Sequence, residues 1–247
     1  MEKTKTSPLS FIKKWCYDKR LYFLVFFLPV AIMFSAYAFF KIHPIGDSSV
    51  LVLDLNGQYV YYYEQFRDAF HGNGSFIYNW SRNLSGEMFG VFAYYLASPF
   101  MLILVLLPRT MMATSILILQ LAKIGTAAVT FMFFLKKISV QKPKTISLII
   151  FPTMYALMSY MVVQLMDPMW LDGLIYLPLI CWGVHRLVDE GKLVPYIVLV
   201  LPFKRGQDIA KKVLLTLCGF RYRHACCAYV CGVRSYNRLQ FFEAWQV

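Results

Sequence analysis

Long apolar stretches constrain the fold of this chain more than any other feature of its sequence. Residues 21–40, 110–135 and 145–166 carry at most one charged side chain each, and a weaker apolar stretch covers residues 173–188. A helix needs about twenty apolar residues to cross a bilayer, and inside lipid a helix satisfies its own backbone hydrogen bonds. The chain is therefore predicted to be an all-α polytopic membrane protein with about four spans.

The basic residues flank the apolar stretches instead of covering a soluble surface. The net charge is +12, and the dense clusters fall at residues 3–20, at residues 136–144 and after residue 204. Cytoplasmic loops of membrane proteins are enriched in lysine and arginine. We therefore predict a cytoplasmic basic N-terminus over residues 1–20, with the lipid bilayer as a partner and no nucleic-acid partner. Residues 21–40 are too long for a signal peptide, so they are predicted to remain as a span.

The topology depends on one further apolar stretch, residues 91–108. If it crosses the membrane, the four lysines between residues 136 and 144 lie opposite the N-terminus, against the usual charge asymmetry. If it lies at the interface or re-enters, those lysines return to the cytoplasmic side. Pro99 and Pro108 interrupt or end this stretch, as expected of an element that does not span. We predict the second arrangement, in which residues 41–109 form an outer loop that includes the re-entrant segment.

The last fifth of the chain has a different character. A partial span begins at residues 193–202 and stops at Lys204, so the predicted membrane domain covers residues 21–202. Residues 203–247 are basic and rich in cysteine, with no amphipathic period. We expect this tail to lie outside the native fold, and a frame-shifted reading is our hypothesis for it. The tail has no metal-ligand spacing of cysteine and histidine, so no metal site is predicted there.

Four charged residues near or inside the apolar stretches are candidates for function. Asp54 has apolar neighbours, and partial desolvation would favour a general base, with a structural role as the alternative. Asp172 could act on substrate or simply cap the next helix, and Asp167 could be a turn residue. Lys123 lies in the middle of a span, where it either snorkels or pairs with an anion. If residues 91–108 do not cross, all three aspartates share the outer side.

Several short motifs, taken in order, resemble the YfhO-type bacterial membrane proteins. They are Asp54-Leu55-Asn56-Gly57-Gln58-Tyr59, Asn83-Leu84-Ser85-Gly86, Tyr94-Tyr95-Leu96-Ala97-Ser98-Pro99 and Trp170-Leu171-Asp172-Gly173, together with Lys123. Each motif is loose by itself, whereas their order and spacing together are specific. That family is similar to the GT-C glycosyltransferases, so the resemblance implies a GT-C-like helical bundle with a juxtamembrane element after the first outer loop.

The resemblance implies a glycosyltransferase that takes a sugar from a polyprenyl-phosphate carrier. The implied acceptor is a cell-envelope polymer such as teichoic or lipoteichoic acid, on the outer face of the bacterial cytoplasmic membrane. Asp54, as the base, and Asp172 are the implied catalytic residues. The implied substrate-binding residues are Asp167, Lys123, Gln58, Tyr59 and Trp170. Some enzymes of this class use a divalent metal and others do not, so no cofactor is predicted.

Two further expectations concern the length of the chain and the functions that it could have instead. Family members are much longer than 247 residues, so we expect a truncated member that is inactive by itself. A transporter or flippase component for lipid-linked substrates would place polar residues on several facing helices, and only Lys123 fits. A non-catalytic membrane assembly protein would use Asp54 as a structural carboxylate.

Overall fold

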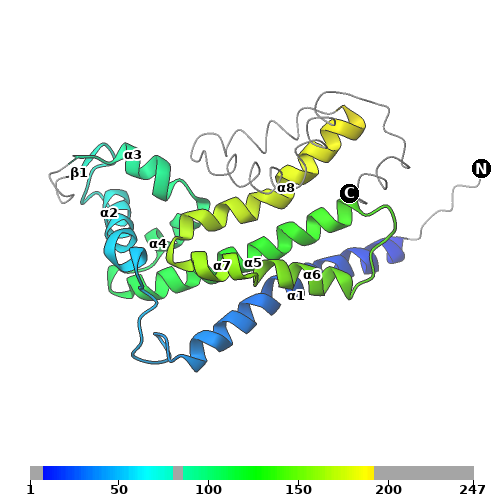
Figure 1. Ribbon diagram of the computed structural model, residues 1–247, viewed down its shortest axis with the longest axis horizontal. Coiled ribbons are helices and arrows are strands. Elements are labelled where there is room, and N and C mark those ends of the chain that lie inside the picture. The colour runs from blue at the N-terminus through cyan, green and yellow to red at the C-terminus, as the bar shows by residue number, and fades with distance from the viewer. Residues whose placement is uncertain (1–7, 80–85, 192–247) are drawn as a thin grey trace, which may run out of the picture. The chain divides into compact units, whose positions relative to one another are not determined.

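A computed structural model describes residues 8–79 and 86–191, and nearly all of its regular structure is helical (Figure 1). The chain divides into two compact units, Met1–Trp182 and Gly183–Val247, and of the second unit only residues 183–191 are described. The longer helices are α1 (Pro8–Phe39), α2 (Val60–Phe70), α5 (Met112–Ile138), α6 (Ser147–Ala156) and α8 (Pro168–Glu190). The prediction of an all-α polytopic protein is confirmed.

Shorter elements join these helices. They are the π-helical turns η1 (Leu55–Tyr59) and η2 (Phe92–Leu96), the helices α3 (Phe89–Val91), α4 (Leu102–Leu106) and α7 (Ser159–Val163), and the 3-10 turns η3 (Pro99–Met101), η4 (Arg109–Met111) and η5 (Gln164–Met166). Two residues each from β1 (Tyr78–Asn79) and β2 (Gly86–Glu87) pair antiparallel. Most of these short elements belong to the region between α1 and α5.

Three helices are long and apolar enough to cross a membrane within the described part of the chain. They cover Lys19–Phe39, Arg109–Ile138 and Pro168–Asp189. A fourth candidate consists of Ser147–Ala156 and Ser159–Met166, which meet at a bend of 42°. Because these apolar helices can satisfy their own backbone hydrogen bonds in lipid, the chain is a membrane-embedded protein.

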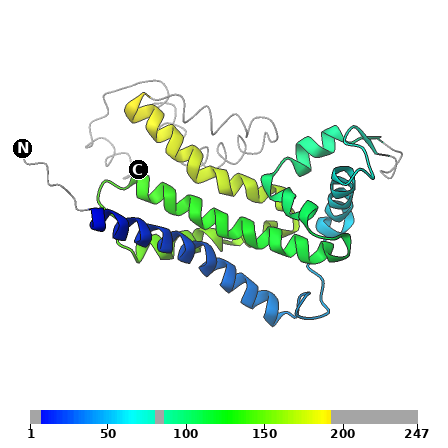
Figure 2. The ribbon, with the colours of Figure 1, turned by 180° about the vertical axis from the view of Figure 1, so that it is seen from behind.

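Helices α1 and α5 run antiparallel and pack closely (Figure 2). Lys136, near the end of α5, lies over the ring of Tyr22 near the start of the apolar part of α1, with 4.4 Å between Nζ and the ring centroid. Farther along, the Tyr37 hydroxyl donates a hydrogen bond of 3.0 Å to Oε1 of Gln120. Residues 40–111 therefore leave α1 and enter α5 at the same end of this helix pair.

The region between these helices builds a second apolar core. Leu55, Tyr59, Tyr63 and Phe66 recur at helical spacing along η1 and α2, and all four are buried. They pack with residues of η2, α4, the first half of α5 and the start of α8. Aromatic rings share much of this core, because their large apolar surfaces are stabilised by removal from water. The core fixes the position of α2 beside the start of α8.

Two predicted segments have a different local structure from the one expected from hydropathy. Residues 91–108 form successive short turns from α3 to α4, with extended backbone at Ser98 and Leu107, each before a proline. Their placement in or on the membrane stays a prediction. Helix α8 begins at Pro168, five residues before the expected start of that span, because proline is well suited to the first position of a helix.

Proline in the middle of α8 is accommodated by a neighbouring side chain. Pro178 has no backbone N–H, so the carbonyl of Leu174, four residues earlier, loses its helical partner. The Tyr155 hydroxyl of α6 donates a hydrogen bond of 2.7 Å to this carbonyl. The bond ties α6 to α8. The predicted partial span at residues 193–202, the tail at residues 203–247 and the boundary between them lie outside the described residues.

Candidate functional site

Lys123 is fully buried and holds the first turn of α8. It lies eleven residues into α5, about 16 Å along the helix at 1.5 Å per residue. Its Nζ forms an ion pair of 2.9 Å with Oδ1 of Asp172 and donates a hydrogen bond of 2.8 Å to the carbonyl of Pro168. The ring centroid of Phe100 lies 5.5 Å from the same nitrogen. The sequence left two roles open for Lys123, snorkelling and pairing with an anion. In the structure Lys123 pairs with Asp172.

Asp172 is the fifth residue of α8 and does not cap this helix. The capping alternative is wrong because the helix starts at Pro168, so the backbone of Asp172 already lies within the helical turn. Its side chain retains 16% exposure beside the buried Lys123. The Asp172 carboxylate therefore balances a buried positive charge, an arrangement that desolvation makes necessary inside a membrane protein.

Asp167 precedes α8 and meets a tyrosine from the loop after α1. The Tyr59 hydroxyl donates a hydrogen bond to the Asp167 carboxylate, and Tyr59 itself is buried. Desolvation raises the pKa of Asp167, and the nearby negative charge of Asp54 raises it further, while the bond from Tyr59 acts in the opposite direction. Asp54 is thus near enough to Asp167 for its charge to raise the pKa of that carboxyl, although the two are more than one hundred residues apart in the sequence.

Asp54 is exposed, which corrects the expectation that its apolar neighbours would desolvate it. Val52 and Leu53 are themselves 52% and 73% exposed, and only Leu55 turns into the core. Leu53 has a φ of 46°, in the left-handed region, and this kink turns the segment before η1 outward. The Asp54 side chain makes no capping bond to η1. Its carboxylate is therefore accessible to an external molecule.

Tyrosines surround the two aspartates. The ring of Tyr95 lies 5.2 Å from that of Tyr59 and 5.0 Å from that of Tyr62, between ring centroids. Burial raises the pKa of Tyr95, as do Tyr62, Tyr94, Asp54 and Asp167. Tyr95 is thus near both carboxylates.

Tyr63 is the functional candidate that sequence reasoning missed. It is fully buried, and its hydroxyl has no hydrogen-bond partner within the part of the chain that the structure describes. Burial raises the pKa of Tyr63, and the charges of Asp172 and Asp167 add to this effect. Tyr63 therefore lies near both Asp172 and Asp167. The spacing of Leu55, Tyr59 and Tyr63, four residues apart, was the available signal for this buried face.

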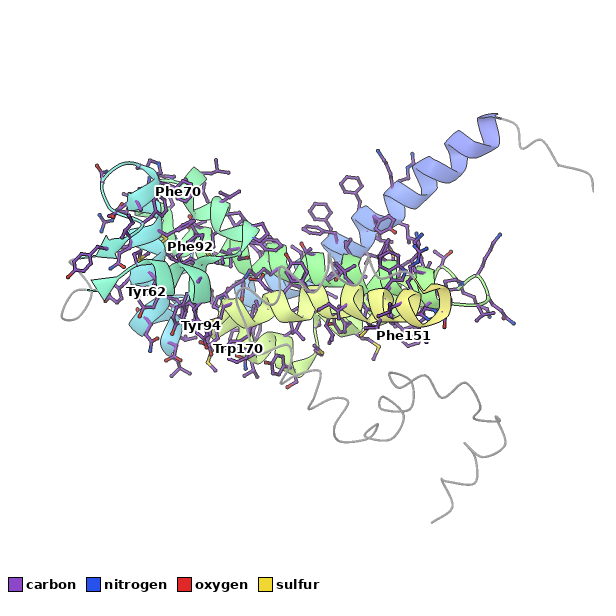
Figure 3. The ribbon with its side chains drawn as sticks, turned by 90° about the horizontal axis from the view of Figure 1, so that it is seen from above. Tyr62, Phe70, Phe92, Tyr94, Phe151 and Trp170 are labelled. Carbon is purple, nitrogen blue, oxygen red and sulfur yellow. The ribbon has the colours of Figure 1, made fainter. Side chains whose placement is uncertain are left out.

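Gln58 and Trp170 lie at the edge of this cluster. Gln58 is exposed on η1, directly before the buried Tyr59. Trp170 is partly buried and packs against the aromatic core. Figure 3 shows Tyr62, Tyr94 and Trp170 on α2, η2 and the start of α8. The backbone N–H of Trp170 donates a hydrogen bond of 3.0 Å to the carbonyl of Asp167. The substrate-binding role of Gln58 and Trp170 stays a prediction.

Within the described ranges, residues 8–79 and 86–191, no group of three or more histidine, cysteine, aspartate or glutamate side chains could hold a metal ion. Asp54 and Asp167 give the site two nearby carboxylates. One is exposed, and the other is partly buried and hydrogen-bonded to a buried tyrosine. Such a pair can accept a proton from, or orient, a hydroxyl group placed against it.

Comparison with known proteins identifies a family. A family model described as bacterial membrane protein YfhO matches residues 25–201, which is more than half of the chain. No curated protein and no solved structure matches.

Proposed function

Because the chain belongs to the YfhO family of bacterial membrane proteins, we propose that it serves a membrane glycosyltransferase reaction. In this reaction a sugar moves from a polyprenyl-phosphate carrier to a hydroxyl of a cell-envelope polymer such as teichoic or lipoteichoic acid. The observation that carries the proposal is an exposed carboxylate, Asp54, whose charge raises the pKa of a partly buried one, Asp167. Two such carboxylates near each other suit an acid–base role better than a purely structural one.

Asp54 is the proposed base. As the acceptor oxygen attacks the anomeric carbon, its proton passes to the Asp54 carboxylate. The bond between the anomeric carbon and the carrier phosphate breaks, and the phosphate leaves with the electron pair. Attack opposite the leaving group inverts the configuration at that carbon. Asp167 lies beside Asp54 and is held by Tyr59, so its proposed role is to orient the hydroxyl and to sustain the proton affinity of the site.

We assign the cation that meets the departing phosphate to a residue other than Lys123. The sequence indicates that Lys123 could pair with an anion, and the family resemblance implies that it binds substrate. Its Nζ already contacts Asp172 and the carbonyl of Pro168, and its side chain has no exposed surface. A buried and paired ammonium group cannot approach a lipid phosphate unless both contacts break.

The proposed location is the outer face of the bacterial cytoplasmic membrane, with the N-terminus in the cytoplasm. The antiparallel packing of α1 and α5 supports it, since residues 40–111 begin and end on one side. The lysines after α5 then lie on the same side as the start of α1. This arrangement agrees with the excess of basic residues expected in cytoplasmic loops.

The test measures envelope glycosylation in cells and in isolated membranes. This chain and a longer YfhO-family member are each expressed in their normal form and with Asp54, or the aligned aspartate, changed to asparagine. Membrane abundance is matched between normal and variant proteins. We expect sugar transfer by the longer protein to fall by roughly 100-fold or more in the variant, the scale of a lost general base. Unchanged transfer at equal abundance would contradict the assignment and favour the transport or assembly functions.

A further inference from the structure

We propose that Lys123 and Asp172 form a positioning pair, whose ion pair sets the first turn of α8 and thereby holds Asp167 against Tyr59 and beside Asp54. The proposal rests on the glycosyltransferase function above and assigns Asp172 a different task within it. Asp172 becomes a positioning residue, while the reacting carboxylates are Asp54 and Asp167. Lys123 becomes the anchor on α5 and not a ligand for substrate.

The two contacts of Lys123 fix one helical turn at both ends. The carbonyl of Pro168 belongs to the first residue of α8, and the carboxylate of Asp172 belongs to the fifth. A single ammonium group, 2.8 Å from the first and 2.9 Å from the second, therefore ties a full turn of α8 to the middle of α5. Burial strengthens such contacts, because water does not compete with them.

The fixed turn continues directly into Asp167. Proline restricts its own φ and also the backbone of the residue before it. Asp167 has a φ of −123° and a ψ of 72°, and it is bonded to Pro168. With its backbone restricted in this way, Asp167 has little freedom to move independently of the α8 turn. The position of that turn then decides whether the Asp167 carboxylate can accept the hydrogen bond from Tyr59.

Asp172 itself is poorly placed for proton transfer. Its charge is balanced by Lys123 at 2.9 Å, and only 16% of its side chain is exposed. Asp54, in contrast, is exposed, and its charge acts on Asp167. Tyr63, which is fully buried, lies near both Asp167 and Asp172. The site therefore consists of a reacting pair, Asp54 and Asp167, and a supporting pair, Lys123 and Asp172.

The experiment compares four forms of this chain purified in detergent: the unchanged chain, Asp172→Asn, Lys123→Met, and the paired variant Lys123→Met/Asp172→Leu. Removing one partner leaves a buried charge uncompensated, whereas replacing both by apolar side chains is often tolerated. The first readout is the titration of the Asp167 carboxyl by infrared difference spectroscopy, with Asp167→Asn as the reference that identifies its signal. The second is the thermal unfolding midpoint.

We expect both single variants to lower the midpoint and to shift the pKa of Asp167 down towards its ordinary value, because a loosened turn exposes this carboxyl to water. The paired variant should restore both quantities. The control removes an ion pair of similar length outside the site: Arg109→Met/Glu64→Leu breaks the 3.0 Å contact between η4 and α2. That control should leave the Asp167 titration unchanged.

Two outcomes would overturn the positioning role. In the first outcome, the pKa of Asp167 does not depend on the ion pair. It stays shifted in a paired variant that has regained its stability, or it is unchanged in both single variants. In the other, the corresponding paired variant of a transfer-active family member is stable and titrates normally, yet its sugar transfer remains reduced by roughly 100-fold, so that Asp172 must act on substrate. The Asp167 titration is measured without any sugar transfer. It therefore tests the positioning role even if the proposed glycosyltransferase function fails its own test.

Discussion

At the scale of single residues, buried polar side chains form hydrogen bonds that link particular helices. Gln120 accepts a hydrogen bond from Tyr37 and donates one of 2.8 Å to the carbonyl of Leu165, which links α1, α5 and η5. Tyr155 satisfies the carbonyl that Pro178 leaves without a partner. Unpaired polar groups are costly in an apolar interior, so these side chains determine which helices can be neighbours.

Replacement of Tyr155 by phenylalanine should lower the stability of the chain. The ring and its packing remain, but the carbonyl of Leu174 loses the hydroxyl that replaces the missing N–H of Pro178. We expect a loss of about 1–2 kcal/mol, the usual cost of an unsatisfied buried group. Thermal unfolding in detergent measures it, with Tyr160→Phe as the control because Tyr160 is 40% exposed. Equal midpoints for the two variants would contradict the proposed role of Tyr155.

Asp167 should make the stability of the chain depend on pH. Its folded pKa lies above its ordinary value of 3.8, so between these two values the folded state binds more protons than the unfolded state. Stability is then highest below the ordinary pKa and falls as the pH rises through the folded pKa. Asp167→Asn cannot ionise, so it should lack this fall.

The measurement is the unfolding midpoint of both chains in one detergent across a pH series that starts near the ordinary carboxyl pKa. The difference between Asp167→Asn and the unchanged chain should shift in favour of the variant as the pH rises. A constant difference would show that this carboxyl is not desolvated in the folded chain.

At the scale of helices, close approach of α1 and α5 requires a residue without a side chain. A Cβ added to Gly125 would lie 2.7 Å from Cε2 of Phe26, far inside ordinary contact distance. Small residues allow membrane helices to approach closely, since apolar side chains gain nothing by leaving lipid for one another. Gly125 therefore sets the spacing of the helix pair on which the site is built.

Gly125→Ala should destabilise the pair of helices by about 1–3 kcal/mol, the usual cost of overpacking. Combining it with Phe26→Leu, which removes the clashing ring atoms, should recover part of this loss. Gly57→Ala is the matched control, because nothing lies within 4 Å of a Cβ at that position. If Gly125→Ala unfolds at the temperature of the control, the two helices are not held at the distance described.

At the scale of the whole molecule, the basic cluster after α5 and the aspartates of the site lie at different ends of the α1–α5 pair. Lys136 on Tyr22 brings the basic cluster after α5 next to the one at the start of α1. At the other end, Gln120 bonds to the carbonyl of Leu165, two residues before Asp167, and the charge of Asp54 acts on Asp167. The separation agrees with a cytoplasmic N-terminus, which we propose from the charge asymmetry.

Labelling with a membrane-impermeant thiol reagent tests this orientation. In a chain whose six native cysteines are serine, one cysteine is introduced as Asn56→Cys or as Ser139→Cys, both exposed positions. In intact cells without an outer membrane, we expect the reagent to label position 56 and to reach position 139 only after permeabilisation. The reverse pattern would invert the proposed topology and move the aspartates to the cytoplasmic side.

Sequence patterns were sufficient for the fold class, the main apolar helices and the family. Length and lack of charge decide those features locally, and the motifs around Asp54 and Asp172 identify the family without coordinates. The helix start at Pro168 was missed because the charged Asp172 interrupts the apolar stretch and was interpreted as a cap before the helix, not as a residue paired inside it. The exposure of Asp54 was missed because apolar neighbours in sequence do not determine which way the backbone turns.

The sequence by itself thus determined that this protein is a bundle of membrane helices with a few charged residues near or inside its apolar stretches. Only the tertiary structure decided which of those charges meet. Lys123 pairs with Asp172, and Asp54 acts on Asp167, through contacts that span more than forty residues in the first case and more than one hundred in the second. Pairing at such separations depends on how helices pack, and the packing arises from buried faces, close contacts such as Gly125 on Phe26, and satisfied carbonyls.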